Sequence, residues 1–254
     1  MNINSPLIFL KNVYSIYEGE KRPTINDINL TIEKGEFIYI IGPNASGKTT
    51  LLETINGLIH TVKGAIKVFG LDLNKNSQKI RKRIAYMLQT WDIAPNEPFL
   101  VKDIVMMGRS GKLGVFVNPK KEDWEVVKNY LDTVGMLDYY KRPIGKLSGG
   151  EQQKIFLAKS LAQEAPILML DEPFSNLDTD SRKRALEILK KYKKSHNATI
   201  LIVSHFLSDV SFEIDFIDRI LLMQSGSIIK DGPPKEILQS NEYQCLEKEE
   251  ELIK

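Results

Sequence analysis

Apolar positions along the chain fall into two kinds of run, and the two kinds alternate. Short continuous runs at Phe37–Ile41, Ile167–Leu170 and Thr199–Val203 predict buried strands, because a strand covered on both faces needs no polar side. Stretches with helical spacing separate these runs. The alternation predicts an α/β fold with a mostly parallel sheet covered by helices.

The pattern differs at the two ends of the chain. Leu7–Leu10 and Ile28–Ile32 predict two further short strands. Arg219–Met223 and Ile228–Lys230 flank a polar Gln-Ser-Gly-Ser turn, which predicts a hairpin. The charged tail at Glu247–Lys254 is expected to fray.

Between about residues 91 and 162 the spacing becomes helical, at Val101–Met107, Glu122–Val134 and Glu151–Ala162. Glycine and proline residues separate these three stretches. We therefore predict a helical subdomain, residues 91–162, inserted into an α/β core formed by residues 1–90 and 163–254.

Composition mainly excludes classes of protein and of partner. The 254 residues are 42% hydrophobic and 27% charged, with a net charge of +2, which offers no electrostatic case for a nucleic-acid partner. Cys245 is the single cysteine, so an intrachain disulfide is impossible, as fits a reducing compartment. No apolar run approaches the roughly 20 residues that a membrane-spanning helix needs, and no signal peptide is visible. A role at a membrane would thus require docking onto another protein.

A glycine-rich segment follows the strand at Phe37–Ile41 and opens a helix, the context that a phosphate-binding loop requires. Glycines let backbone N–H groups approach phosphate oxygens, and the helix N-terminus favours negative charge. The lysine supplies a positive charge to the terminal phosphates, and the Thr49 hydroxyl is placed to bind Mg²⁺. The candidate residues are Gly42, Pro43, Asn44, Ala45, Ser46, Gly47, Lys48 and Thr49.

Two carboxylates end the predicted strand at Ile167–Leu170. Open α/β sheets place their ligands at the carboxyl ends of strands. We expect Asp171 to bind Mg²⁺ directly or through water, and Glu172 to polarise the attacking water as a general base.

The segment Leu147–Glu151 ends sixteen residues before Ile167, where the run that leads to the acidic pair begins. In it Ser148, Gly149 and Gly150 open another helix, so their N–H groups and the serine hydroxyl form a second anion site. Five features then align in one order: Gly42–Thr50, Gln89, Leu147–Glu151, Ile167–Glu172 with Ser175–Asp178, and His205. In this order and spacing, the chain resembles the nucleotide-binding domain of ATP-binding cassette (ABC) proteins over essentially its whole length.

The resemblance implies a P-loop NTPase fold of RecA type with an N-terminal antiparallel β subdomain. It implies that Tyr17 stacks on adenine, that Thr50 completes the phosphate loop, and that Gln89 reaches Mg²⁺ or the attacking water. It further implies that His205 contacts the γ-phosphate and holds Glu172. Lys154 and Lys159 depart from the family's usual arginines, which puts a bidentate contact there in doubt. Thr90 stands where an acid is common.

The resemblance also implies partners. Two subunits, identical or related, would pair head to tail around ATP and Mg²⁺, with Asp178 at their seam and Ser148–Gly150 capping the other subunit's nucleotide. Sequence segments such as Asp103–Arg109 resemble those of ABC proteins that import metal ions or metal chelates. We thus expect an ATPase docked through residues 91–100 onto an integral membrane permease at the cytoplasmic face of the membrane, served indirectly by an extracytoplasmic solute-binding protein. A soluble ATP-driven clamp and the motor of a multi-chain exporter remain alternatives.

Overall fold

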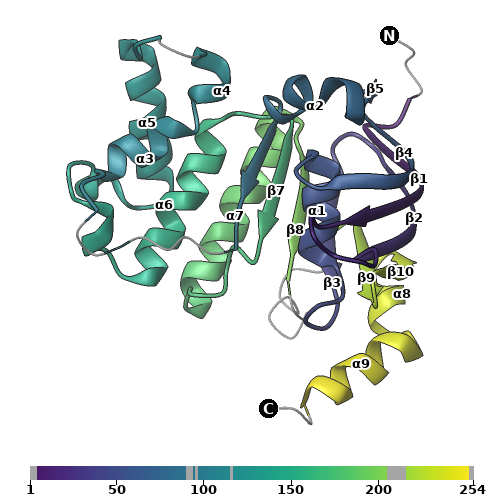
Figure 1. Cartoon of the computed structure of the whole chain (residues 1–254). Coiled ribbons are helices and arrows are strands. Elements are labelled where there is room, and N and C mark those ends of the chain that lie inside the picture. The colour runs from purple at the N-terminus through teal and green to yellow at the C-terminus, as the bar shows by residue number, and fades with distance from the viewer. Residues whose placement is uncertain (1–4, 90–93, 95–96, 115–116, 205–215, 252–254) are drawn as a thin grey trace. The chain divides into compact units, whose positions relative to one another are not determined.

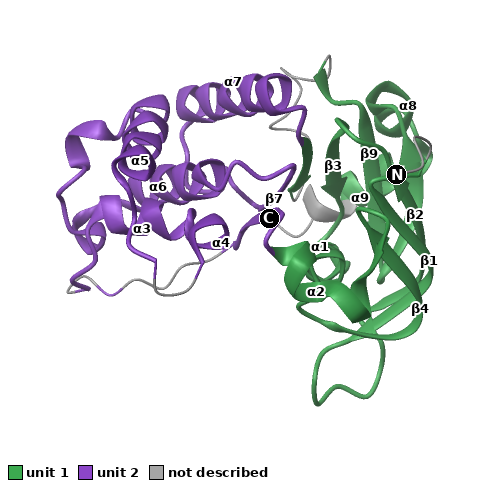
Figure 2. Ribbon diagram, turned by 90° about the horizontal axis from the view of Figure 1, so that it is seen from above, with its two compact units in different colours: residues 1–81, 199–254 green, residues 82–198 purple. Residues whose placement is uncertain are grey.

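The computed structural model describes residues 5–89, 94, 97–114, 117–204 and 216–251. Its contacts divide the chain into two compact units, coloured separately in Figure 2: residues 1–81 and 199–254 form unit 1, and residues 82–198 form unit 2. The chain leaves unit 1 after Arg81 and returns to it at Thr199. The boundaries expected for a helical subdomain, 91–162, stay a prediction.

Unit 1 contains an antiparallel sheet with the strand order β2-β1-β4-β5. Along β2, buried Ile28, Leu30 and Ile32 alternate with exposed residues, so one face of this strand is turned to the core. The bounds are β1 (Ile8–Ile16), β2 (Ile25–Ile32), β4 (His60–Val68) and β5 (Leu71–Asp72), followed by the helix α2 (Leu73–Arg81).

The second group of strands in unit 1 has the order β10-β9-β3-β8. The central β3 pairs in parallel with β8 and β9 and is buried along its whole length, which explains its uninterrupted apolar sequence. A two-residue turn, Ser225-Gly226, joins β9 to β10, and both residues have positive φ, as a type I′ hairpin turn requires. The bounds are β3 (Phe37–Ile41), α1 (Lys48–Asn56), β8 (Thr199–Val203), β9 (Arg219–Gln224), β10 (Ser227–Gly232), α8 (Pro234–Leu238) and α9 (Asn241–Glu251).

Unit 2 combines a parallel pair of strands with a group of helices. The buried strand β7 pairs in parallel with β6, and α3, α5 and α6 pack against one another (Figure 1). Val105, Val127 and Leu161 are fully buried. The bounds are β6 (Ile84–Met87), α3 (Val101–Met107), α4 (Ser110–Leu113), α5 (Lys121–Thr133), the 3₁₀ turns η1 (Leu137–Tyr139) and η2 (Ile144–Lys146), α6 (Gly149–Ala162), β7 (Ile167–Asp171) and α7 (Thr179–His196).

An ionic cluster around Arg109 joins the helices of unit 2. The Arg109 guanidinium lies 3.1 Å from Asp123 and 2.7 Å from Glu164, and it also donates to the carbonyl of Ala162 at the end of α6. Asp123 in turn accepts from the backbone N–H of Lys120 and so caps α5. Because each charge has several partners, the cluster ties the end of α3 to α5 and α6 without leaving an uncompensated buried ion.

The α/β architecture and the parallel strands expected from the sequence are confirmed. The predicted limits of Phe37–Ile41, Thr199–Val203 and Val101–Met107 agree with β3, β8 and α3. The helix α9 extends as far as Glu251, and residues 252–254 lie outside the described residues, so the fraying expected for the tail stays a prediction. None of the described helices is long and apolar enough to cross a membrane.

Candidate functional site

The loop between β3 and α1 has the backbone conformation that its glycines predict. Gly42 has a φ of 151°, and a Cβ there would lie 2.1 Å from the carbonyl oxygen of Met223, so only glycine fits. Gly47 has a φ of 97° and caps the N-terminus of α1. The backbone N–H of Gly226 donates to the Ser46 carbonyl, so the β9–β10 turn supports the loop from outside.

The same loop presents positive charge. The Lys48 ammonium, on a residue only 6% exposed, donates to the carbonyls of Gly42 at 2.8 Å and Pro43 at 2.9 Å, so its side chain lies back across the loop. The first turn of α1 carries no acidic residue and no side-chain cap. A helix N-terminus with a lysine beside it suits an anion with several oxygens, such as a polyphosphate.

Tyr17 lies one residue beyond the end of β1 and is 38% exposed. Its hydroxyl donates to a carboxylate oxygen of Glu53 at 2.7 Å and lies 3.2 Å from the hydroxyl of Thr50, both on α1. The Tyr17 hydroxyl therefore contacts the same helix, α1, that the phosphate loop opens within unit 1. The stacking role expected for this ring stays a prediction.

The carboxylate pair lies in unit 2, at the carboxyl end of β7. Asp171 is the last residue of the strand and is only 1% exposed, so it places an acid in a buried position where a divalent cation would compensate its charge. Glu172 follows with a φ of 48°, a left-handed conformation that costs a non-glycine residue of order 1 kcal/mol or more and often occurs at functional sites.

The backbone after Glu172 is held by the side chain of Gln153 on α6, a residue 5% exposed. Its amide nitrogen donates to the Glu172 carbonyl at 2.9 Å, and its amide oxygen accepts the N–H of Asn176 at 2.9 Å. One side chain thus bridges both ends of the Glu172–Asn176 turn. Sequence reasoning missed Gln153, because a glutamine on a helix carries no signal of what it contacts in three dimensions.

Ser148 begins α6 as a reciprocal capping box. The Ser148 hydroxyl accepts the N–H of Glu151 at 3.4 Å, while the Glu151 carboxylate accepts the Ser148 backbone N–H at 2.8 Å and the hydroxyl at 3.0 Å. These hydrogen bonds, the backbone one first, lower the pKa of Glu151. The Ser-x-x-Glu pattern could have revealed this cap from the sequence. A Cβ at Gly150 would lie 2.8 Å from the Asn176 carbonyl oxygen, so the helix start needs glycine there.

Gln89 and the start of α6 line one cavity of about 160 Å³ within unit 2. The cavity is lined by Met87, Leu88, Gln89, Gly149, Gln152, Gln153, Phe156 and Asn176. Two expected site residues, Gln89 and Gly149, therefore meet at one place. His205 and Thr90 lie outside the described residues.

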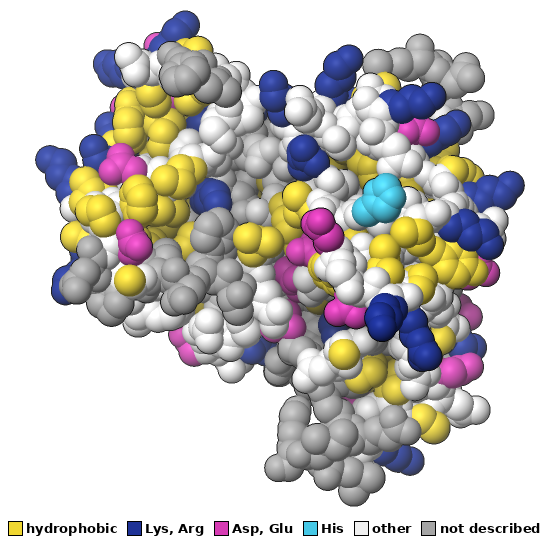
Figure 3. Space-filling view, viewed as in Figure 1, with side chains coloured by type: hydrophobic (Ala, Val, Ile, Leu, Met, Phe, Trp, Pro, Cys, Tyr) yellow, Lys and Arg dark blue, Asp and Glu magenta, His cyan; other side chains and the backbone are white. Residues whose placement is uncertain are grey.

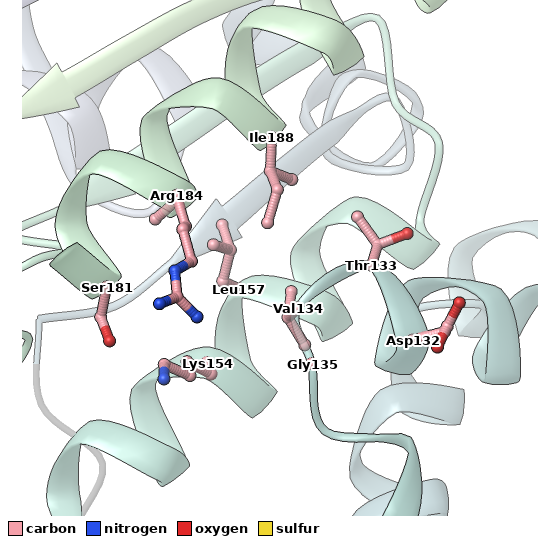
Figure 4. Close-up of a pocket in the computed structure, with 10 residues that line it drawn as sticks. Asp132, Thr133, Val134, Gly135, Lys154, Leu157, Ser181, Arg184 and Ile188 are labelled. Atoms are coloured by element: carbon pink, nitrogen blue, oxygen red, sulfur yellow. The ribbon is translucent and has the colours of Figure 1, made fainter.

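Asp178 caps α7 by accepting the backbone N–H and the hydroxyl of Ser181, at 2.8 and 2.9 Å. These bonds, the backbone one first, lower the pKa of Asp178, with a smaller contribution from the charge of Lys154. Lys154 from α6 and Arg184 from α7 line one cavity of about 200 Å³ (Figure 4). The apolar side chains of Leu157 and Ile188 line the same cavity.

Comparison with known proteins gives consistent results. The family model for ABC transporters matches residues 25–175. The manganese transport system ATP-binding protein MntB of Bacillus subtilis (strain 168) is 40% identical over 86% of this chain and 84% of that protein. The zinc transport system ATP-binding protein TroB of Treponema pallidum (strain Nichols) is 36% identical over 80% of this chain and 73% of that protein.

Solved structures of ABC transporters are also similar to this chain. A transporter described as of the metal-chelate ABC type, in an inward-facing conformation, has a TM-score of 0.79 and 27% identity, covering 96% of this chain and 90% of that one. A bacterial ABC transporter cassette solved as a dimer has a TM-score of 0.78 and 25% identity, covering 89% of this chain and 98% of that one.

Proposed function

Because this chain belongs to the ABC transporter family, as an ATP-binding subunit that hydrolyses ATP, we propose that it drives the import of a metal ion or metal chelate. The import would pass through a separate integral membrane permease. The similarity to a manganese transport ATP-binding protein over most of both chains carries this proposal, and the similarity to a zinc transport counterpart supports it. The protein would act at the cytoplasmic face of the membrane, with a solute-binding protein delivering cargo from the far side.

In this proposal the nucleotide is held from two directions. Tyr17 stacks on the adenine, and the loop from Gly42 to Thr50 binds the phosphates through its N–H groups and Lys48. Two subunits pair head to tail, so that Ser148, Gly149 and Gly150 of one cap the γ-phosphate held by the other. The glycine-opened start of α6 supports the capping role, because its backbone N–H groups point out of a helix N-terminus.

In the proposed function, the acidic pair Asp171 and Glu172 is central to ATP hydrolysis. Glu172 takes the proton of the attacking water, assisted by Gln89 and His205, while Asp178 lies at the seam between the subunits. Thr49, Gln89 and Asp171 are the candidate ligands of Mg²⁺, which when bound would neutralise phosphate charge. The buried carboxylate of Asp171 fits such a cation. The cargo metal need never touch this chain.

Replacing the proposed general base tests this function. We expect Glu172→Gln to bind ATP yet to lose about 10²–10⁴-fold in turnover, because the amide cannot accept the proton. With Mg·ATP the variant should accumulate as a dimer in light scattering, since the γ-phosphate that joins the subunits is retained. Lys48→Ala is the matched control, because it should bind ATP poorly and remain monomeric.

Near-normal turnover in Glu172→Gln would remove Glu172 as the base. A variant that stays monomeric at saturating Mg·ATP would refute the shared site. Purification from detergent-solubilised membranes separates transport from a soluble clamp: a multi-span permease should accompany the protein, and its consistent absence would favour the clamp.

A further inference from the structure

The hydroxyl of Tyr17 is anchored to α1 by a directed chain of hydrogen bonds. An ionised carboxylate can only accept, so the single Tyr17 proton goes to Glu53, 2.7 Å away. The Thr50 hydroxyl, 3.2 Å away, then supplies its own proton to the Tyr17 oxygen. The chain therefore runs from Thr50 through Tyr17 to Glu53, and each bond polarises the next.

This anchoring restricts a ring that is partly exposed. Tyr17 follows β1 rather than lying within it and is 38% exposed, whereas Thr50 is 4% exposed and belongs to the rigid start of α1. A tyrosine side chain has only two χ angles, so anchoring the hydroxyl fixes the long axis of the ring. Because the O–H bond of a phenol prefers to lie in the plane of the ring, its direction toward Glu53 also favours one ring plane. A ring whose plane is set before a ligand arrives loses less conformational entropy on binding.

The anchor also relates the ring to the phosphate loop. Glu53 lies five residues after Lys48 on α1, the helix that begins at that loop. The helix that presents its N-terminus to the phosphates thus also sets the orientation of the aromatic ring. The distance between a base on Tyr17 and a phosphate at Lys48 is then fixed by one rigid element.

We infer that Glu53 is a positioning residue for the nucleotide base, because it holds Tyr17 in the orientation in which the ring stacks on adenine. The inference rests on the proposed function, in which Tyr17 is the stacking residue. Glu53 itself would touch neither the base nor the phosphates. Its effect should therefore appear only for ligands that carry a base.

Binding of Mg·ADP and of Mg·pyrophosphate to the full chain, measured by calorimetry, tests this role, because neither ligand supports hydrolysis. Glu53→Leu should weaken ADP binding about three- to tenfold, the range expected when an aromatic stacking contact is lost. Pyrophosphate binding should change less than about twofold, because the phosphate loop is untouched. Glu53→Gln keeps an acceptor oxygen and, like leucine, is a good helix former, so it should retain most of the ADP affinity.

A double-mutant cycle completes the test. Tyr17→Phe keeps the ring but loses the hydroxyl, so it should match Glu53→Leu, and the double variant should lose no more than either single variant. Additive losses, or an equal loss of pyrophosphate affinity in Glu53→Leu, would overturn the inference. ADP affinity that survives Tyr17→Ala would instead remove the stacking role from the proposed function, whereas sensitivity to Tyr17→Ala with indifference to Glu53→Leu would overturn the inference alone.

Discussion

Burial changes the charge behaviour of Lys159, a residue of α6. Desolvation lowers the pKa of its ammonium from 10.5 to about 8, because the largely buried site disfavours the charged form. In the unfolded chain the ordinary pKa returns. Between about pH 8 and 10.5 the unfolded state therefore binds more protons than the folded state, and stability from this group rises with pH through that window.

Lys159→Met should remove this dependence. Below pH 8 the variant should be more stable than the wild type, because a charged group no longer has to be desolvated, and the difference should shrink as the pH approaches 10.5. Urea unfolding at several pH values measures it, with Lys154→Met on the same helix as the control. If the difference in the free energy of unfolding between variant and wild type stayed constant across this pH range, burial of the Lys159 ammonium would not destabilise the fold.

Among single residues, those of the phosphate loop and the acids at the end of β7 could be predicted from the sequence, because their chemistry requires particular residue types at fixed spacing. The bridges made by Gln153 and Glu53 were not. Each depends on a partner brought close by folding: Gln153 bonds a carbonyl 19 residues away, and Glu53 a hydroxyl 36 residues away. No local pattern encodes such a pair.

Among the elements, the connection between α6 and the turn after β7 matters most for the proposed chemistry. Gln153 donates to the Glu172 carbonyl and accepts from Asn176, and Glu172 has positive φ. A strained residue keeps its conformation only when its surroundings over-determine it. The start of α6, proposed to cap the partner's nucleotide, is thus mechanically joined to the proposed base.

Gln153→Leu should lower kcat for ATP hydrolysis about ten- to hundredfold while ADP affinity stays within about twofold, because a small displacement of a reacting group costs rate rather than binding. Gln153→Glu keeps the acceptor for Asn176 but loses the donor to Glu172, so it should be similarly impaired. Gln152→Leu is the control, because the Gln152 amide donates to the carbonyls of Ile144 and Leu147 and, among the described residues, makes no hydrogen bond to the Glu172–Asn176 turn. An equal loss in that control would indicate general damage to α6.

Elements with strong apolar runs were predicted, and weakly patterned ones were not. In β4 most residues are exposed, and buried positions alternate with exposed ones over Ile66–Val68 alone, so the pattern is too short to predict the strand, and pairing with β1 defines it instead. α2 is mostly polar and contains Asn76 with non-helical dihedral angles. In both cases tertiary contacts decide the local structure, and the local sequence carries little information about it.

On the scale of the whole molecule, unit 2 carries exposed apolar side chains that suit a partner. Phe99 is 45% exposed, Met107 44%, Val117 50% and Leu137 38%. Figure 3 shows hydrophobic side chains gathered over the part of unit 2 that carries α3, α4 and α5. Apolar surface of this kind is common at protein interfaces. Half of the docking region expected at residues 91–100 lies outside the described residues, whereas residue 94 and residues 97–100 are within them.

Glu97→Lys should reduce transport by the assembled system and leave basal ATP hydrolysis within about twofold, because a charge reversed at a docking surface acts on the partner and not on the nucleotide. Transport in membrane vesicles and hydrolysis by the isolated protein are the two readouts. Glu187→Lys on the exposed face of α7 serves as the control reversal. Equal loss of both activities would place Glu97 outside the docking surface.

The carboxylate of Glu151 has a consequence for how two subunits would come together. It already accepts the Ser148 N–H and hydroxyl at the start of α6, so a single subunit carries its own negative group at that helix end. A γ-phosphate arriving from the opposite subunit would compete for the same donors. Under the proposed function, association would exchange one anion for another at this helix end, and the returning carboxylate would help to expel phosphate once the terminal bond is cut.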